Sequence, residues 1–385
     1  MSFLKKILIT ATVQSHICQF HKPLVQMLRE QGDVEIHVAA RDNLKEKNGL
    51  KLDFADRVFD VPFDRSPFSL KNIKAYRELK KIIDENHYDY IHCNTPVGGL
   101  LTRAAARKSR SRGTKVLYTA HGFHFYKGAP RKNWLIYYPI ERFAARWTDA
   151  LITINAEDHA LARERFPCPV FGIHGVGVSA ERYYPAMPER QGLLREKLGF
   201  LPEERLILCV GELLPNKNQQ MAIAAMQQVV RQFPDARLLL AGNGPQKETL
   251  EEQVRSCGLE KHVVLLGYCT NLEEYQQIAE IAISCSRREG LPLNIIEAML
   301  SRNPVVATHN RGHDELVRDG ETGYLVQVDD VDALAQRLCT LLASPELADQ
   351  MGRQGLVLAT GYTVPVVQEE LKEIYFGEAM LTERA

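Results

Sequence analysis

The sequence has no long hydrophobic run. Hydrophobic residues make up 45% of the 385-residue chain, yet no apolar stretch approaches the roughly 20 residues of a membrane-spanning helix. Near the N-terminus, Ile7-Leu8-Ile9 is too short for the core of a signal peptide, and no small-residue cleavage site follows it. Low-complexity tracts and fixed-period repeats are also absent. We therefore expect a globular protein of the cytoplasm.

The eight cysteines lack the spacing of a redox or zinc site, because no two of them form a C-x-x-C pair. Several fall in expected strands or helices, which favours reduced thiols inside a hydrophobic core. The pattern predicts no zinc site.

Charge is balanced over the whole chain but not along it. Residues 1–185 carry 29 Lys and Arg against 19 Asp and Glu, and residues 186–385 carry 19 against 29, so the two parts stand at +10 and −10. Arg103, Arg107 and Arg110 share one face of an expected helix. Such a face is compatible with ordinary solvated surface, or with contact to an anionic acceptor or an anionic membrane. No aromatic residues interleave with it, so we expect no nucleic-acid binding.

Apolar, strand-like runs alternate with helical segments through the whole chain, which is the pattern of parallel βαβ units. A chain of 385 residues exceeds the size at which a single core stops growing, so we expect two domains. Residues 183–189 contain two prolines and predict the linker. The expected strands are 6–10, 35–39, 89–93, 115–119, 150–154 and 170–173 before the linker, and 206–210, 237–241, 263–266, 281–285, 304–307 and 323–326 after it.

The segment from Arg288 to Met299 places two carboxylates, Glu289 and Glu297, across a loop and the start of a helix. A buried strand precedes it, and Pro292 opens the helix, so Glu289 follows a strand's carboxyl end. Ligands of open α/β sheets bind at that edge, where the free N–H groups of the next helix can hold a phosphate. Taken alone, the two residues favour the plainer interpretation, in which Glu289 is a loop charge and Glu297 a solvated helix residue.

This segment resembles the signature of glycosyltransferase family 4, the retaining, metal-independent sugar-nucleotide transferases of GT-B fold, and the resemblance runs nearly end to end. It implies an α/β protein with two doubly wound Rossmann-like domains and an inter-domain cleft. The first, acceptor-side domain would span residues 1–184 and include a C-terminal helix at about 362–385. The donor-binding domain would span residues 185–361.

The resemblance also implies roles for the residues of the segment. Glu289 would contact the donor sugar and Glu297 the ribose, while main-chain groups of Gly290 and Leu291 would contact the donor. Arg288, next to the site by sequence, is a candidate cation for the donor diphosphate.

The first βα turn of the expected second domain runs from Val210 to Asn218, and its Lys217 aligns with a lysine of the family. A lysine there neutralises the donor diphosphate, increasingly as the phosphate leaves. Gly211 begins the turn and is expected to contact the donor. Glu212 departs from the family, which usually has an arginine at this position, so another cation must compensate: Arg287, Arg288 or Arg311. Gly-Glu-Leu followed by Lys-Asn resembles the bacterial capsule and exopolysaccharide branch.

Two further strand ends of this domain are expected at the donor. Ala241-Gly-Asn-Gly-Pro245 resembles a Gly-x-Gly-Pro loop of the family, which assigns Asn243 and Gly244 to donor binding. Tyr268 follows the next strand, where the family loop lies beside the nucleotide base. No third glycine completes a dinucleotide fingerprint, which disfavours a dehydrogenase.

Histidines follow strand ends in the first half of the chain. His121 matches the family's cleft histidine, and an imidazole there can donate to a sugar hydroxyl or an acceptor phosphate. The alternative is a histidine satisfied in a strand-end network. His16, His21 and His124 are candidate acceptor ligands; His16 and His21 could equally cap the next helix.

We therefore predict a retaining glycosyltransferase with Glu289, Lys217 and His121 as catalytic residues. It would move a hexose or N-acetylhexosamine from a nucleoside-diphosphate sugar, of UDP type, to a glycan or polyprenyl-diphosphate-linked acceptor in bacterial surface polysaccharide synthesis. The predicted site has no D-x-D motif, and we expect neither cofactor nor metal. The enzyme is expected at the inner face of the plasma membrane, as a peripheral protein. A sugar-nucleotide epimerase of the same fold and a non-catalytic nucleotide-sugar-binding subunit are the alternatives.

Overall fold

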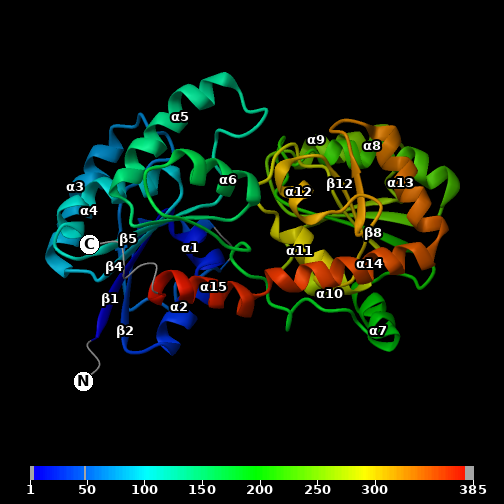
Figure 1. The fold of residues 1–385 in the computed structure, drawn as a ribbon. Helices are drawn as coiled ribbons and strands as arrows, with labels where there is room; N and C mark the ends of the chain where they lie inside the picture. The colour runs from blue at the N-terminus through cyan, green and yellow to red at the C-terminus, as the bar shows by residue number, and fades with distance from the viewer. Residues whose placement is uncertain (1–3, 47–48, 378–385) are drawn as a thin grey trace. The chain divides into compact units, whose positions relative to one another are not determined.

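The computed structural model describes residues 4–46 and 49–377 (Figure 1). The chain forms two compact units, one containing the residues up to Gly177 and those from Val364 onward, the other Val178–Thr363. Residues 178–184, which the sequence assigned to the first domain, thus fold with the second, where the Arg182 guanidinium donates to Glu273 at 2.7 Å. Residues 362 and 363 also belong to the second unit. Residues 378–385 of the predicted final helix lie outside the described residues.

The first unit contains a parallel sheet of seven strands in the order β3-β2-β1-β4-β5-β6-β7. The strands are β1 (Lys5–Val13), β2 (Val34–Arg41), β3 (Arg57–Asp60), β4 (Tyr90–Asn94), β5 (Lys115–Ala120), β6 (Ala150–Thr153) and β7 (Val170–Gly172). Strand order reverses between the hydrogen-bonded neighbours β1 and β4. Open α/β sheets bind ligands at such a switch point, at the carboxyl ends of the strands.

Helices connect these strands, as parallel pairing requires. They are α1 (Gln14–Phe20), α2 (Lys22–Glu30), α3 (Lys71–Asn86), α4 (Pro96–Arg110), α5 (Arg131–Ala144), α6 (Ala156–Arg165) and, from the end of the chain, α15 (Val364–Phe376), with 3₁₀ turns η1 (Leu44–Glu46) and η2 (Ala145–Trp147). Helix α15, red in Figure 1, lies beside α2. The Tyr375 hydroxyl of α15 is 2.7 Å from Nδ1 of His92 in β4, so the predicted return of the last helix to the first sheet is present.

The second unit contains a parallel sheet of six strands in the order β10-β9-β8-β11-β12-β13. The strands are β8 (Arg205–Val210), β9 (Ala236–Ala241), β10 (Val263–Gly267), β11 (Ile281–Ser284), β12 (Val305–Thr308) and β13 (Gly323–Val326). The helices are α7 (Pro188–Leu198), α8 (Gln219–Gln232), α9 (Lys247–Ser256), α10 (Leu272–Ile278), α11 (Leu293–Leu300), α12 (Arg311–Leu316), α13 (Val331–Ala343) and α14 (Pro345–Ala359), followed by η3 (Thr360–Tyr362). Here the order reverses between β8 and β11.

The predicted strands are all present, and the sequence missed one, β3. That strand is four residues long, lies at the edge of the sheet and is largely exposed. Its sequence, Arg-Val-Phe-Asp, has only two apolar residues between two charged ones, so the longer apolar run that marks a buried parallel strand is missing.

The basic face of α4 is only partly free, because two of its three arginines have acidic partners. Arg103 is buried, pairs with Glu141 at 2.6 Å and stacks over the Tyr118 ring at 3.9 Å. Arg110 pairs with Asp149 at 3.0 Å. Arg107, on the same face, is exposed, so carboxylates compensate only part of the charge of this face.

All eight cysteines are free thiols, and Cys93, Cys209 and Cys285 are buried, in keeping with core positions. Over residues 4–46 and 49–377, none of the helices combines the length and the apolar character needed to cross a bilayer.

Candidate active site

Lys217 and Glu289 meet at the carboxyl edge of the second sheet. Lys217 lies in the loop after β8 and Glu289 in the loop after β11, the two strands at the switch point. Lys217 Nζ is 2.6 Å from Glu289 Oε1, and both side chains are partly buried. Lys217 and Glu289 thus form one ion pair although 72 positions separate them in the sequence. Each had been predicted to bind the donor from a different motif.

Backbone contacts hold the two loops together. The Asn216 side chain donates to the Arg288 carbonyl at 3.0 Å, and the Arg287 N–H donates to the Asn216 carbonyl at 2.8 Å. Asn218, which directly precedes α8, adopts a left-handed backbone with φ of 53°, and its side chain donates to Asp329 at 3.1 Å. The positions of Lys217 and Glu289 are therefore fixed by their own loops.

Gly312 lies directly against Glu289. A Cβ at this position would come within 2.8 Å of Glu289 Cβ and 3.0 Å of Pro292 Cδ, so a larger residue would displace the loop. Asn310 fixes the approach, since its Oδ1 accepts from the N–H groups of Gly312 and His313, both at 3.1 Å. Neither Asn310 nor Gly312 was predicted from the sequence. The Asn-x-Gly spacing after a strand was the available signal.

Of the three arginines considered as compensation for Glu212, one remains available. Arg287 forms two bonds of 2.7 Å with Asp329, and Arg311 donates to the Glu289 carbonyl at 3.3 Å. Arg288 is exposed, and within the described part of the chain no group pairs with its guanidinium. Glu212 is also exposed. Arg288 thus keeps an exposed cation next to Glu289 in the sequence, while Arg311 contacts the Glu289 main chain through its Nε.

Glu297 lies on α11 in an environment that disfavours its charge. Burial raises its pKa to about 7, against a hydrogen bond from the buried Tyr183 hydroxyl and the nearby Arg182 cation, which both favour the carboxylate. The Asn294 side chain ties the start of α11 to the Val210 carbonyl at 3.0 Å. The helix therefore holds Glu297 near the end of β8, and the carboxyl group of Glu297 titrates close to neutral pH.

We expect Glu297→Gln to remove a pH dependence. Because the folded pKa is raised from 4.5 to about 7, the protonated form contributes stability that is present below about 4.5 and lost as the pH rises through about 7. Above pH 7 the variant should thus unfold at a higher denaturant concentration than the wild type. Its free energy of unfolding should be larger by at most about 3 kcal/mol, at ~1.4 kcal/mol per pKa unit.

The same substitution tests nucleotide binding, measured by calorimetry with a nucleotide sugar, whose diphosphate has no group titrating in this range. If the ribose needs the carboxylate, wild-type affinity should rise about tenfold from about pH 6 to about pH 8, following the ionised fraction. The Gln variant should bind more weakly at high pH and show no rise. Equal pH profiles for the two proteins would contradict the ribose assignment of Glu297.

The glycines after β8 and β9 allow two loops to pack backbone against backbone. A Cβ on Gly242, whose φ is +150°, would lie 2.0 Å from the Gly211 carbonyl oxygen, and one on Gly244 would lie 2.4 Å from that of Leu213. The close approach of the two loops thus requires glycine at these positions, whether or not the glycines contact a ligand. Of the other predicted donor positions, Tyr268 is 48% exposed, Leu291 is buried, and Asn243 and Gly290 are partly or fully accessible.

In the first unit, histidines gather at the switch point of the first sheet. His16 follows β1, His121 follows β5, and Asn94 ends β4. Nε2 of His121 is 3.0 Å from Asn94 Oδ1 and 3.3 Å from Nε2 of His16. Burial lowers the pKa of His121 to about 3 and that of His21 to about 4, so both imidazoles are neutral.

In the described part of the chain, His124 makes its contacts outside this cluster. Its ring stacks on Tyr137 with centroids 4.6 Å apart, and its carbonyl accepts from Asn133 at 2.9 Å. His16 and His121 are therefore brought together as candidate acceptor ligands, while His124 packs against α5.

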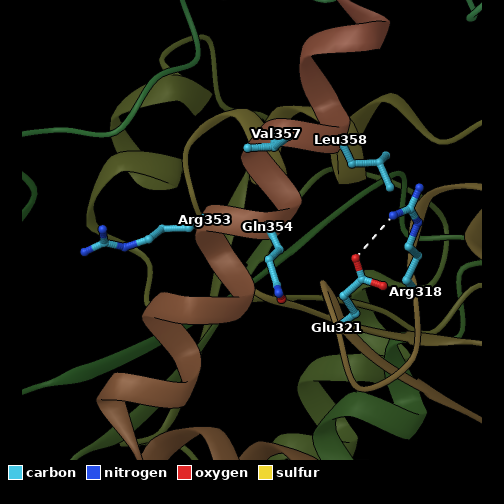
Figure 2. A pocket seen from close by; sticks show the side chains of 6 residues that line it. All are labelled: Arg318, Glu321, Arg353, Gln354, Val357 and Leu358. Atoms are coloured by element: carbon cyan, nitrogen blue, oxygen red, sulfur yellow. Dashed lines mark hydrogen bonds and ion pairs between the residues drawn. The ribbon is translucent and has the colours of Figure 1, made fainter.

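A surface hollow of the second unit lies away from the candidate site (Figure 2). It borders α14 and the turn before β13, where Arg318 donates to Glu321 at 3.2 Å. Its lining residues are Arg318, Glu321, Arg353, Gln354, Val357 and Leu358. This turn precedes β13, so the hollow is not at the carboxyl ends of the strands, and it includes no predicted site residue.

The two Rossmann-like units, the second with a lysine–carboxylate pair at its switch point, form an α/β protein of GT-B fold. Residues 191–356 match the family "Glycosyl transferases group 1" and residues 6–155 match "Glycosyl transferase 4-like". The chain is 43% identical over 373 residues to "Putative glycosyltransferase EpsD" of Bacillus subtilis (strain 168), with 96% of each protein covered. The chain belongs to the group 1 glycosyltransferases.

Other relatives extend this result. "UDP-Gal:alpha-D-GlcNAc-diphosphoundecaprenol alpha-1,3-galactosyltransferase" of Escherichia coli is 27% identical over 332 residues, which cover 84% of each chain. Among solved structures, Anabaena Alr3699/HepE in complex with UDP and glucose aligns with a TM-score of 0.78 at 19% identity, covering 96% of this chain and 99% of that one. WaaG, a glycosyltransferase involved in lipopolysaccharide biosynthesis, aligns with a TM-score of 0.76 at 15% identity, covering 96% and 100%. At these identities the two structures establish the shared fold.

Proposed function

We propose that the protein is a retaining glycosyltransferase that moves a hexose or N-acetylhexosamine from a UDP-sugar to a hydroxyl of a lipid-linked glycan, in the synthesis of a bacterial surface polysaccharide. The observation that carries this proposal is the 2.6 Å pair of Lys217 and Glu289 at the switch point of the second sheet. The galactosyltransferase relative uses a UDP-sugar and a diphosphoundecaprenol acceptor by name, and HepE binds UDP. Both support the same class of donor.

The residues of the second unit divide the work on the donor. Lys217 and Arg288 offset the negative charge that develops on the diphosphate as the bond to the sugar breaks. Glu289 accepts hydrogen bonds from sugar hydroxyls and orients the ring. Glu297 accepts from the ribose diol. The acceptor oxygen forms the new bond to the anomeric carbon and passes its proton to the departing phosphate, so no protein nucleophile is needed.

His121 and His16 supply the polar groups proposed for the acceptor in the first unit. A neutral imidazole both donates and accepts, so it can bind a hydroxyl or, as a donor, a phosphate oxygen. His121 already donates toward Asn94 Oδ1, 3.0 Å away, which sets its ring orientation.

The mechanism is proposed to need no metal at the diphosphate. The sequence does contain one D-x-D at Asp330-Val-Asp332, but these residues begin α13: Asp330 accepts from the Ala333 N–H at 3.0 Å and Asp332 from Gln228 at 2.6 Å. Both carboxylates thus have structural partners away from Lys217 and Glu289.

A transfer assay in excess EDTA tests the reaction class. With a UDP-sugar and a lipid-linked glycan acceptor, NMR should show a product with the anomeric configuration of the donor, at a rate that EDTA does not reduce. Inversion at the anomeric carbon, or turnover restored only by Mn²⁺, would contradict the proposal. A sugar that changes without any acceptor would favour an epimerase, and binding without turnover a non-catalytic partner subunit.

Contact with an anionic membrane is proposed through α5 of the first unit instead of α4. This helix exposes Leu135 (77%) and Phe143 (51%) beside the exposed cations Arg131 and Lys132. Its one acid, Glu141, is buried against Arg103. An exposed helix face that is apolar and basic suits an anionic lipid surface.

We expect the protein to sediment with vesicles that contain anionic lipid and not with neutral vesicles. Leu135→Glu with Phe143→Glu should abolish this, because two carboxylates would replace the apolar contact. Val357→Glu is the control, since Val357 is comparably exposed on the second unit (73%). Unchanged sedimentation of the double variant would remove α5 from the membrane contact.

A further inference from the structure

Three histidines of the first unit converge closely enough to share one ion. His16 lies on α1, His21 joins α1 to α2, and His121 follows β5. One ring nitrogen from each lies within 4.8 Å of the other two. His21 is almost completely buried, whereas His16 and His121 are partly exposed, so the group is closed on one side and accessible on the other.

The spacing of the polar atoms fits a tetrahedral cation. With Zn–N bonds of about 2.0–2.1 Å, two ligand atoms of a tetrahedron lie about 3.3–3.4 Å apart. Nε2 of His16 and Nε2 of His121 are 3.3 Å apart, and Asn94 Oδ1 is 3.0 Å from Nε2 of His121. The longest nitrogen separation, up to 4.8 Å, requires the third imidazole to approach by at most about 1.4 Å.

His21 supplies an independent observation. Its Nδ1 is buried and has no hydrogen-bond partner among the described residues. Buried polar atoms of native proteins nearly always have a partner, so an unpaired nitrogen on one of the three clustered rings points to a ligand. A cation bound by the three imidazoles would give the His21 ring that interaction.

The chemistry of the group selects the kind of ion. All three residues offer an imidazole nitrogen as the ligand atom. Neutral nitrogen ligands suit Zn²⁺, while Mg²⁺ and Ca²⁺ prefer oxygen ligands and carboxylates. The group contains no carboxylate.

We propose that His16, His21 and His121 form a binding site for a zinc-class divalent cation, with Asn94 as the adjacent oxygen ligand or hydrogen-bond acceptor. This goes beyond the proposed transfer reaction, in which no metal participates. Because His16 and His121 are also the proposed acceptor ligands, occupancy by zinc and binding of an acceptor exclude each other. Zinc is thus an inhibitor in this account, and its removal by EDTA does not lower turnover.

The test measures metal binding by the full-length, tag-free protein after chelator treatment, and so needs neither donor nor acceptor. Calorimetry should show one equivalent of Zn²⁺ bound, with micromolar or tighter affinity, and no competition from excess Mg²⁺. Co²⁺ should give the visible absorption of a tetrahedral site. His21→Gln and His16→Ala should each weaken Zn²⁺ binding about tenfold or more, while His309→Ala, on an exposed loop of the second unit, should not.

Two variants are used because His21 is buried and its replacement could disturb folding, which thermal unfolding of the metal-free proteins would reveal. Failure of the wild type to bind a stoichiometric Zn²⁺ would overturn the proposal. So would equal binding by wild type and a folded His16→Ala protein. Neither result would affect the assignment of the donor site, which rests on the second unit.

Discussion

Replacing Lys217 by alanine is expected to lower turnover on the order of 100-fold or more, about 3 kcal/mol of leaving-group stabilisation. The loss has two physical causes. The diphosphate loses its partly buried cation, and Glu289, which Lys217 Nζ contacts at 2.6 Å, becomes an unpaired carboxylate near the departing phosphate. Steady-state rates with a UDP-sugar and acceptor measure the effect, with Lys247→Ala as control because Lys247 makes only an exposed pair with Glu251 at 3.7 Å.

A double-mutant cycle separates the two causes. If Lys217→Ala acts partly by exposing Glu289, then adding Glu289→Gln should cost less than it does in the wild type, because the unpaired charge is then removed. Glu212→Arg should leave turnover unchanged or lower it, if Lys217 and Arg288 together already offset the charge of the diphosphate. A silent Lys217→Ala together with a tenfold gain from Glu212→Arg would show that this picture of the phosphate site is wrong.

Replacing Glu289 by glutamine is expected to reduce turnover about 10- to 150-fold while nucleotide affinity stays within a few-fold of the wild type. The lost charged hydrogen bond, about 1.5–3 kcal/mol, falls on the sugar and not on the nucleotide. Turnover and the calorimetric affinity for UDP, measured on the same preparation, separate the two quantities. Full activity in the variant would remove Glu289 from the mechanism.

Gly312 provides a test of the same carboxylate without changing it. Gly312→Ala places a Cβ 2.8 Å from Glu289 Cβ, so it should lower turnover in the same direction as Glu289→Gln. Gly192→Ala is the matched control, because a Cβ there has no atom within 4 Å. Equal turnover for the two glycine variants would mean that the position of Glu289 is not critical.

The order of the strands and helices could be predicted because both sheets are parallel. Buried parallel strands read as short apolar runs, and the helices that join them follow from the same pattern. β3 escaped because it is an exposed edge strand. The boundary near residue 178 was not predicted, because the two prolines at 183–189 indicated a linker there. Arg182 instead bonds to Glu273, which joins residues before the prolines to the second unit.

The candidate site could be predicted residue by residue but not as an arrangement. Sequence motifs singled out Lys217, Glu289 and Glu297 one by one, whereas the contact between Lys217 and Glu289 depends on how loops from distant strands meet. The same limit applies to the arginines: a one-dimensional pattern cannot tell that Arg287 is occupied by Asp329 while Arg288 is not. For Arg103 the sequence predicted an exposed position on a basic helical face. The structure instead buries Arg103 in an ion pair with Glu141.

The most direct test of the donor site is the binding of UDP-sugars to the wild-type protein and to Lys217→Ala, measured by thermal unfolding and calorimetry. A cognate donor at 100 times its dissociation constant should stabilise the wild type by about 2.7 kcal/mol. The variant should require a much higher concentration for the same shift. If no nucleotide sugar stabilises the wild type, or if the variant binds a donor as tightly as the wild type, then the pair formed by Lys217 and Glu289 is not the donor site.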